Sequence, residues 1–369
     1  MGIETIVNIS HKYGSDEEFV LAGGGNTSYK DEENLYIKGS GTSLATIKAD
    51  GFVKMSRKRL SEIWEKTYSQ NPAKREAEVL KDMMEARCEG EEAKRPSVET
   101  LLHNLFPHTY ILHVHPARVN GITCSQGGEN VVKHLFPEAI WVKETEPGYI
   151  LASECRSKLE KYKAETGKAA NLLFLQNHGI FFAANGEKGL DLLVSYVIGT
   201  IKAQEKIVPD FTEVKKDTET VEKIKTVLSY ELGGATVKFT LNKEIATLCK
   251  SKESFAPVAY PMTPDHIVYC KSSPLFVDGA ENIIKDISDF SGKHGFMPKI
   301  VFVKDVGMFA CGKDEKDAGT AEKLWLDEIK ISVYAKNFGG VRPMAENMID
   351  FIANWEVESY RSKVAQGKA

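Results

Sequence analysis

The stretch Tyr110-Ile111-Leu112-His113-Val114-His115 is the most informative part of this sequence. Its apolar beginning predicts a β-strand, and a strand places residues two apart on the same face of its sheet. His113 and His115 would therefore project together, in a chain that has only nine histidines in 369 residues. Two imidazoles aimed at one point are a common beginning of a divalent-metal site.

A third histidine follows a second apolar run. Leu172-Leu173-Phe174-Leu175 predicts a buried strand, and it ends at Gln176-Asn177-His178-Gly179. A histidine at the end of a buried strand, beside a glycine, is where we expect a third ligand. Strands alternate with helical patterns throughout this half of the chain, which favours a layered α/β domain ending near residue 207. The segment from Trp141 to Tyr149, which contains Pro147-Gly148, is expected to be a loop.

Two loops rich in glycine and hydroxyl side chains precede these strands. They are Gly23-Gly24-Gly25-Asn26-Thr27-Ser28 and Gly39-Ser40-Gly41-Thr42-Ser43. The backbone amides of such loops can converge on a phosphate, although two tight hairpin turns are the alternative that the residues alone favour. The first loop is not a dinucleotide fingerprint, because Ser28 stands where that motif needs a third glycine.

Glu99 begins a predicted helix that spans residues 98–106. A carboxylate in the first turn of a helix is stabilised by the helix dipole, and the local sequence alone supports only that interpretation. His103 lies one turn later on the same face. We expect His103 to have a structural role or to support a neighbouring functional residue.

The bulk properties exclude several classes of protein. A net charge of −4 gives no electrostatic reason to expect nucleic acid as a partner. No apolar run approaches the roughly 20 residues of a membrane-spanning helix, and the N-terminus lacks a signal-peptide pattern. The six cysteines are scattered without a CxxC pair, which predicts reduced thiols and a cytoplasmic location.

The second half of the chain contains a partial repeat of the first. After a predicted linker at 208–222, the sequence Val301 to Phe309 aligns with Leu173 to Phe181 at a constant offset of 128, and Val306 replaces His178. A weaker similarity pairs 35–40 with 267–272. We interpret residues 223–369 as a shortened, metal-free second copy with a C-terminal tail; chance similarity of two strand–turn–helix units is the alternative.

Several motifs, taken in order, resemble the class II aldolase/adducin family. They are Gly25-Asn26-Thr27-Ser28, Ser40-Gly41-Thr42, Ser97-Val98-Glu99, His113-Val114-His115 and Asn177-His178-Gly179. Each motif is weak alone, but five in the right order are specific. The sequence is most similar to the aldolase half of bifunctional rhamnulose-1-phosphate aldolase/alcohol dehydrogenases, through Lys38 to Ile47, Arg95 to His103, Thr263 to His266 and Gly307 to Asp314.

The resemblance implies a fold and a set of functional residues. The expected fold class is α/β, with an α/β/α layered catalytic domain at 1–207 around a mainly antiparallel sheet, followed by the degenerate copy. The implied zinc ligands are His113, His115 and His178, and Glu99 is the implied catalytic acid/base. The implied phosphate-binding residues are Gly25, Asn26, Ser40, Gly41 and Ser97. Val98 departs from the family, because some members carry a second phosphate-binding serine there.

The same resemblance implies a reaction. We expect a zinc-dependent aldolase, or one using another divalent metal, that cleaves a ketose 1-phosphate such as rhamnulose 1-phosphate to dihydroxyacetone phosphate and an aldehyde. No nucleotide cofactor is expected in this chain, and a homo-oligomer is. The alternatives are a pentulose-phosphate 4-epimerase with the same metal site, and an adducin-like interaction module without chemistry.

Overall fold

The computed structural model describes residues 2–355 and divides the chain into two compact units. Unit 1 comprises the described residues of 1–123, 127–204 and 354–369, and unit 2 comprises 124–126 and 205–353. None of the helices in the described part is both long and apolar enough to span a membrane.

Unit 1 is built on a seven-stranded mixed sheet in the order β3-β2-β1-β4-β7-β6-β5. All neighbouring strands are antiparallel except β5 and β6. The strands are β1 (Asn26–Lys30), β2 (Asn34–Lys38), β3 (Phe52–Ser56), β4 (Tyr110–Val114), β5 (Ile140–Val142), β6 (Leu172–Leu175) and β7 (Gly179–Ala184). All five residues of the central strand β4 are buried, which fits its apolar sequence.

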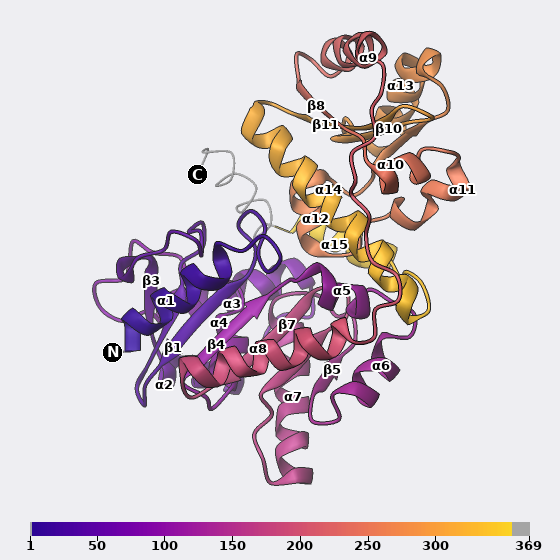
Figure 1. Ribbon diagram of the computed structural model, residues 1–369. Coiled ribbons are helices and arrows are strands. Elements are labelled where there is room, and N and C mark those ends of the chain that lie inside the picture. Colours follow the sequence, from indigo (N-terminus) through magenta and orange to yellow (C-terminus); the bar gives the residue numbers. More distant parts are fainter. Residues whose placement is uncertain (1, 356–369) are drawn as a thin grey trace. The chain divides into compact units, whose positions relative to one another are not determined.

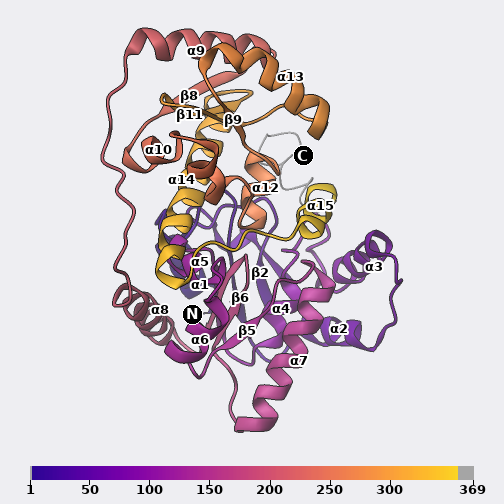
Figure 2. The ribbon, with the colours of Figure 1, turned by 90° about the vertical axis from the view of Figure 1, so that its right-hand side faces the viewer.

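Helices cover both faces of this sheet and produce the predicted α/β/α layering. Figure 2 shows one layer on each side of the strands. One layer contains α1 (Gly2–Gly14), α5 (Ala117–Thr123) and α8 (Glu187–Lys202). The other contains α2 (Arg57–Glu62), α3 (Pro72–Glu85), α4 (Thr100–Leu105) and α7 (Tyr149–Thr166), and it packs on the main hydrophobic core. The remaining helices are α6 (Gly128–Leu135) and the 3-10 turns Ala49–Gly51 and Ile63–Glu65.

Unit 2 has a four-stranded sheet in the order β8-β11-β10-β9. Figure 1 labels β8, β11 and β10 of this sheet. Its strands are β8 (Thr236–Thr240), β9 (Leu275–Val277), β10 (Ile300–Val303) and β11 (Gly307–Gly312). Its helices are α9 (Thr218–Glu231), α10 (Lys243–Leu248), α11 (Lys252–Phe255), α12 (Pro264–Cys270), α13 (Ile283–His294), α14 (Glu315–Ala335) and α15 (Glu346–Asn354), with 3-10 turns at Ala256–Val258, Ala280–Asn282 and Lys336–Phe338.

The sheet of unit 2 repeats the strand order and directions of β4-β7-β6-β5 in unit 1. In both sheets the first two pairs are antiparallel and the last pair is parallel. The turn before β7 and the turn before β11 also match, because Asn177 and Asp305 both have left-handed backbone angles, with φ of 55° and 56°. Residues that are 128 positions apart in these two turns therefore share the same backbone conformation, as expected for a shortened copy.

Three details differ from the sequence-based expectations. Residues 140–142 form strand β5, although the segment from Trp141 to Tyr149 was predicted to be a loop. Residues 267–270 lie in helix α12 and not in a strand, so their similarity to 35–40 has no structural counterpart. Helix α9 begins at Thr218, inside the predicted linker.

Candidate functional site

Three histidines of unit 1 meet at one end of its central strands. His113 lies in β4, His115 follows that strand directly, and His178 lies in the turn between β6 and β7. Their candidate ligand nitrogens all lie within 4.8 Å of one another. Within the described residues, this is the group of histidine, cysteine and acidic side chains that is spaced to hold a metal ion. The structure thus brings together the three ligands predicted from the sequence.

The turn that carries His178 is fixed by backbone contacts. The Asn177 amide donates to the carbonyl of Thr123 at 3.1 Å, and the His178 amide donates to that of Leu175 at 3.2 Å. Asn177 tolerates its left-handed conformation better than most residues. Gly179 then lets the turn approach β4, because a Cβ at this position would lie 2.6 Å from His115 Cδ2 and 2.6 Å from the Val114 carbonyl oxygen.

The donor set fits a divalent transition-metal ion. The Nδ1 of His113 lies 3.0 Å from the Ile180 carbonyl and donates to it, which leaves the Nε2 lone pair available to a metal. The Nε2 atoms of His113 and His115 are 3.0 Å apart. This is close to the separation of about 3.4 Å between two nitrogens on a tetrahedral zinc with Zn–N bonds of about 2.1 Å.

Glu99 places a carboxylate beside this group. It is the N-cap residue of α4, but its side chain makes no capping hydrogen bond and is 7% exposed. Oε1 lies 3.3 Å from His113 Nε2 and 3.6 Å from His178 Nε2. This buried oxygen has no hydrogen-bond partner among the described residues, whereas Oε2 accepts from Asn26 Nδ2 at 2.5 Å. Glu99 thus presents one bare oxygen to the imidazoles.

The predicted phosphate-binding residues lie in three segments: Gly25 and Asn26, Ser40 and Gly41, and Ser97. Ser97 Oγ is 3.3 Å from Asn26 Nδ2, and Ser97 therefore lies next to the residue that contacts Glu99. The Ser40 amide donates to the Arg95 carbonyl at 2.8 Å. This hydrogen bond holds the second glycine loop beside the segment that leads from Arg95 to Ser97. Gly41, in that loop, has a φ of 86°.

Asn26 and its neighbours differ from the loop that the glycines predicted. Asn26, Thr27 and Ser28 begin strand β1, and only the preceding glycines form the turn. Gly25 has a φ of 65°, and a Cβ on it would lie 2.8 Å from the His113 carbonyl oxygen. Because both amide hydrogens of Asn26 face Glu99 and Ser97, its side chain supports the carboxylate, which the sequence did not predict.

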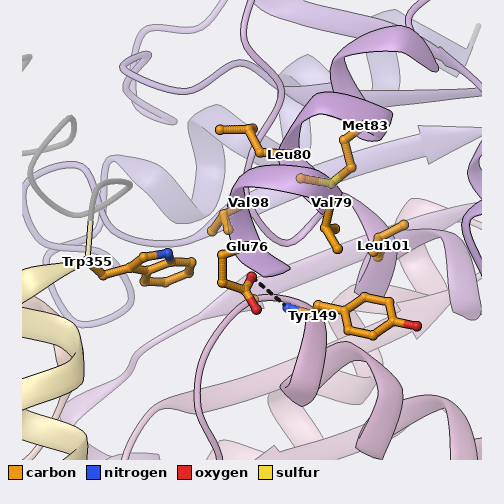
Figure 3. A pocket seen from close by; sticks show the side chains of 9 residues that line it. Glu76, Val79, Leu80, Met83, Val98, Leu101, Tyr149 and Trp355 are labelled. Carbon is orange, nitrogen blue, oxygen red and sulfur yellow. Dashed lines mark hydrogen bonds between the residues drawn. The ribbon is translucent and has the colours of Figure 1, made fainter. Parts of the chain in front are cut away.

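Val98 faces away from this site, into a small apolar pocket. Figure 3 shows Val98 and Leu101 opposite side chains of α3, with Trp355 at one side. Glu76 is the acidic residue in this lining, and it accepts a hydrogen bond from the Tyr149 amide at 3.1 Å. Burial raises the pKa of Glu76. A serine at position 98 would place its hydroxyl in this largely apolar pocket.

The second copy lacks all three histidines at the corresponding positions. Phe239 pairs with Phe309 in unit 2 as His113 pairs with Phe181 in unit 1. By the same register Leu241 stands in the place of His115, and Val306 stands in that of His178. Unit 2 therefore repeats the scaffold of the site without its donors.

Comparisons with known proteins place most of unit 1 in a known family. Residues 4–187 match the class II aldolase and adducin N-terminal domain, a range that contains Glu99 and the three histidines. Through these residues the chain belongs to the class II aldolase and adducin family. The mixed α/β fold and the largely antiparallel central sheet are those of a class II aldolase-type protein.

Individual relatives of this class II aldolase-type chain are distant. The "Uncharacterized oxidoreductase YuxG" of Bacillus subtilis is 23% identical over 427 residues, and the match covers 100% of this chain and 59% of that protein. The N-terminal class II aldolase domain of a conserved Thermoplasma acidophilum protein is 23% identical, with a TM-score of 0.46, and the match covers 55% of this chain and 92% of that one. The L-fuculose-1-phosphate aldolase of Thermus thermophilus is 13% identical, with a TM-score of 0.35 and coverage of 54% and 91%.

Proposed function

We propose that unit 1 is a metal-dependent lyase that reversibly cleaves a ketose 1-phosphate to dihydroxyacetone phosphate and an aldehyde, with rhamnulose 1-phosphate as the first candidate substrate. The observation that carries this proposal is the convergence of Glu99 Oε1 with His113 and His178 at 3.3 and 3.6 Å. A buried carboxylate oxygen without a hydrogen bond, beside three convergent imidazoles, is suited to moving a proton at a carbon next to a polarised carbonyl.

A bound metal ion would stabilise negative charge on the substrate, and the protein would transfer the proton. A divalent cation held by His113, His115 and His178 would supply the positive charge that stabilises the negative charge developing on the substrate oxygens. We assign it as zinc, because neutral imidazoles suit zinc well.

Glu99 would carry the proton to or from the reacting carbon of the dihydroxyacetone phosphate portion. Its Oε2 is held by Asn26 at 2.5 Å, so the proton would move at Oε1. The burial of His113 (0% exposed) and Glu99 (7%) keeps bulk water away from this oxygen.

The substrate phosphate would be held by the backbone of the two glycine loops and by Ser97. Gly25, Ser40 and Gly41 belong to these loops. Asn26 is the remaining residue of the predicted set, but its side-chain amide already contacts Glu99, Ser97 and His103, so we assign that side chain to supporting the carboxylate. Binding a group that does not react restricts the orientation of the part that does. The two loops and Ser97 therefore support a phosphorylated sugar as the substrate class, and within that class we propose a ketose 1-phosphate.

The proposal also assigns the domains, the location and the oligomeric state of the chain. We assign residues 1–207 to the catalytic domain, 208–222 to a linker and 223–369 to the structural second copy. The six cysteines, all within the described part of the chain, form no disulfide, which supports a cytoplasmic location. A homo-oligomer is proposed by analogy with the family.

The first experiment measures metal in the purified protein. Wild type should contain about one zinc per chain, and His178→Ala should lose it. Wild-type protein that holds no metal, and takes up none when zinc is supplied, would support an adducin-like interaction module.

The second experiment is a coupled assay for dihydroxyacetone phosphate over a panel of ketose 1-phosphates and pentulose phosphates. Cleavage that depends on metal and is lost in Glu99→Gln supports the aldolase. Interconversion of pentulose phosphates without release of dihydroxyacetone phosphate would identify a 4-epimerase instead.

A further inference from the structure

Alternate residues of strand β1 all contact α4, the helix that carries Glu99 at its start. Asn26, Ser28 and Lys30 lie two residues apart and therefore on one face of the strand. We call these three residues the β1 ladder. Each is almost fully buried, with exposed fractions of 6%, 0% and 4%. Three buried polar side chains in a row need partners, and α4 supplies them together with the residues that flank it, Ser97, Glu99 and Phe106.

His103 links Ser28 to Asn26, and Asn26 contacts Glu99 directly. Ser28 Oγ lies 2.7 Å from His103 Nδ1, and His103 Nε2 is hydrogen-bonded to Asn26 Oδ1. Asn26 Nδ2 then donates to Glu99 Oε2 at 2.5 Å. His103 is fully buried. A continuous chain of hydrogen bonds therefore runs from β1 through α4 and back to the carboxylate.

When Glu99 is ionised, the chemistry of these groups permits one arrangement of protons. An ionised carboxylate only accepts, so the amide nitrogen of Asn26 must face Glu99 and its oxygen must face His103. His103 Nε2 must then carry the proton that it donates to Asn26. In a neutral imidazole the other nitrogen accepts, so the Ser28 hydroxyl donates to Nδ1. Burial keeps the pKa of His103 well below its usual value, in agreement with the neutral ring.

Lys30 fixes the other end of α4. Its Nζ donates to the carbonyls of His103 and Phe106 at 2.5 and 2.6 Å. These are carbonyls of the last turn and the end of the helix, which lack intrahelical partners. The buried amine of Lys30, whose pKa burial holds well below its usual value, thus fastens the helix at its C-terminal end, while Asn26 holds Glu99 at its beginning.

We propose that His103 is a positioning residue for Glu99. By accepting from Ser28 and donating to Asn26, it locks the Asn26 amide so that Glu99 Oε2 is always occupied and Oε1 alone transfers the proton. This inference rests on the proposed function of Glu99 as the acid/base.

A purely structural role for His103 is the alternative, since its ring also packs edge-on against Phe181, with centroids 5.3 Å apart. His103→Phe keeps a ring of similar size for this contact and removes both side-chain hydrogen bonds. His103→Gln keeps an amide that can donate to Asn26. His134→Phe is the matched control, because His134 is an exposed residue of α6.

The decisive measurement is the exchange of deuterium from solvent into dihydroxyacetone phosphate by the zinc-loaded enzyme. This half-reaction needs the proton transfer but no aldehyde. We expect kcat to fall about 10–100-fold in His103→Phe, with KM and zinc content unchanged and with partial recovery in His103→Gln. His134→Phe should match wild type. A folded His103→Phe protein with wild-type kcat, or with kcat and zinc content reduced together, would overturn the inference.

A second readout does not depend on activity. The 15N chemical shifts of His103 in metal-free protein, identified by their absence in His103→Gln, should show the neutral tautomer protonated at Nε2. The Nδ1-protonated tautomer would overturn the inference. If wild type catalyses no exchange and no cleavage, the proposed function fails, and these spectra still decide the arrangement of the hydrogen bonds.

Ser28→Ala provides a test if His103→Phe does not fold. It removes only the donor to Nδ1, so we expect a smaller decrease in kcat with the fold intact. Wild-type kcat in both Ser28→Ala and His103→Gln would count against a positioning role.

Discussion

Gly179→Ala should separate metal binding from folding. An added Cβ would lie 2.6 Å from His115 Cδ2 and from the Val114 carbonyl oxygen, whereas ordinary contacts begin at 3.4 Å. The missing distance is about 0.8 Å, and Val114 cannot easily move because it is paired with Ile180 in the sheet. The turn that carries Gly179 must therefore move away from β4, and the imidazole of His115 must be displaced as well.

A displacement of this size is large for a metal site. Ligand distances in such sites hold to within about 0.2 Å, so a shift of about 0.8 Å should weaken zinc binding about 100-fold, within the range of about 10–100-fold for changes around a metal centre. This corresponds to about 2.7 kcal/mol. The crowding itself should cost about 1–3 kcal/mol of stability, which leaves a folded protein.

The assay is a competition for zinc between the protein and a chromophoric chelator, together with thermal unfolding of the metal-free protein. Gly186→Ala is the control, since a Cβ at Gly186 meets nothing within 4 Å. If folded Gly179→Ala binds zinc as tightly as Gly186→Ala, then the close approach of this turn to His115 does not set the geometry of the site.

Three further predictions concern other parts of the molecule. Asn26→Asp would place a second carboxylate against Glu99 Oε2, so steady-state kinetics should show kcat reduced about 10–100-fold with zinc content unchanged. Burial lowers the pKa of His266, but the neighbouring carboxylates, first that of Glu328, outweigh burial and raise the pKa to about 10. The protonated imidazole should therefore stabilise the folded protein fully below about pH 6.5, and this stabilisation should be lost as the pH rises to about 10. The free energy of unfolding in urea, measured across this pH range, checks this prediction. Of the six thiols, the partly exposed Cys88 should react with a thiol reagent in the native protein, and the five buried thiols should react only after unfolding.

The convergence of the three histidines could be predicted from the sequence because it depends on local geometry. His113 and His115 share a face through the two-residue period of a strand. His178 follows a buried apolar run and precedes a glycine, and both features are local. The distances between the three imidazoles confirm that grouping.

The partners of Glu99 could not be predicted from local sequence. Glu99 as the N-cap of a short helix is indistinguishable from ordinary helix-end electrostatics. Its position beside the imidazoles depends on the packing of α4 against β1, through Asn26 and His103. A sequence signal existed in the alternation of Asn26, Ser28 and Lys30, but the preceding glycines favoured a loop.

Strand β5 escaped prediction for a different reason. It has only three residues, too few for a periodic pattern, and Pro147-Gly148 follows closely. Its hydrogen-bonding partner is β6, which is separated from it by the whole of α7. A strand of this length is specified by its neighbour in the sheet and not by its own residues.

The replacement of the three histidines in unit 2 has a thermodynamic consequence. An ion that binds only the native state stabilises the elements that hold it, by about 2.7 kcal/mol at a free concentration 100 times its dissociation constant. Zinc should thus slow amide hydrogen exchange in β7 and leave β11, its counterpart beside Val306, unchanged. Strand β11 is therefore an internal control for β7, because both strands belong to one polypeptide and experience the same zinc concentration.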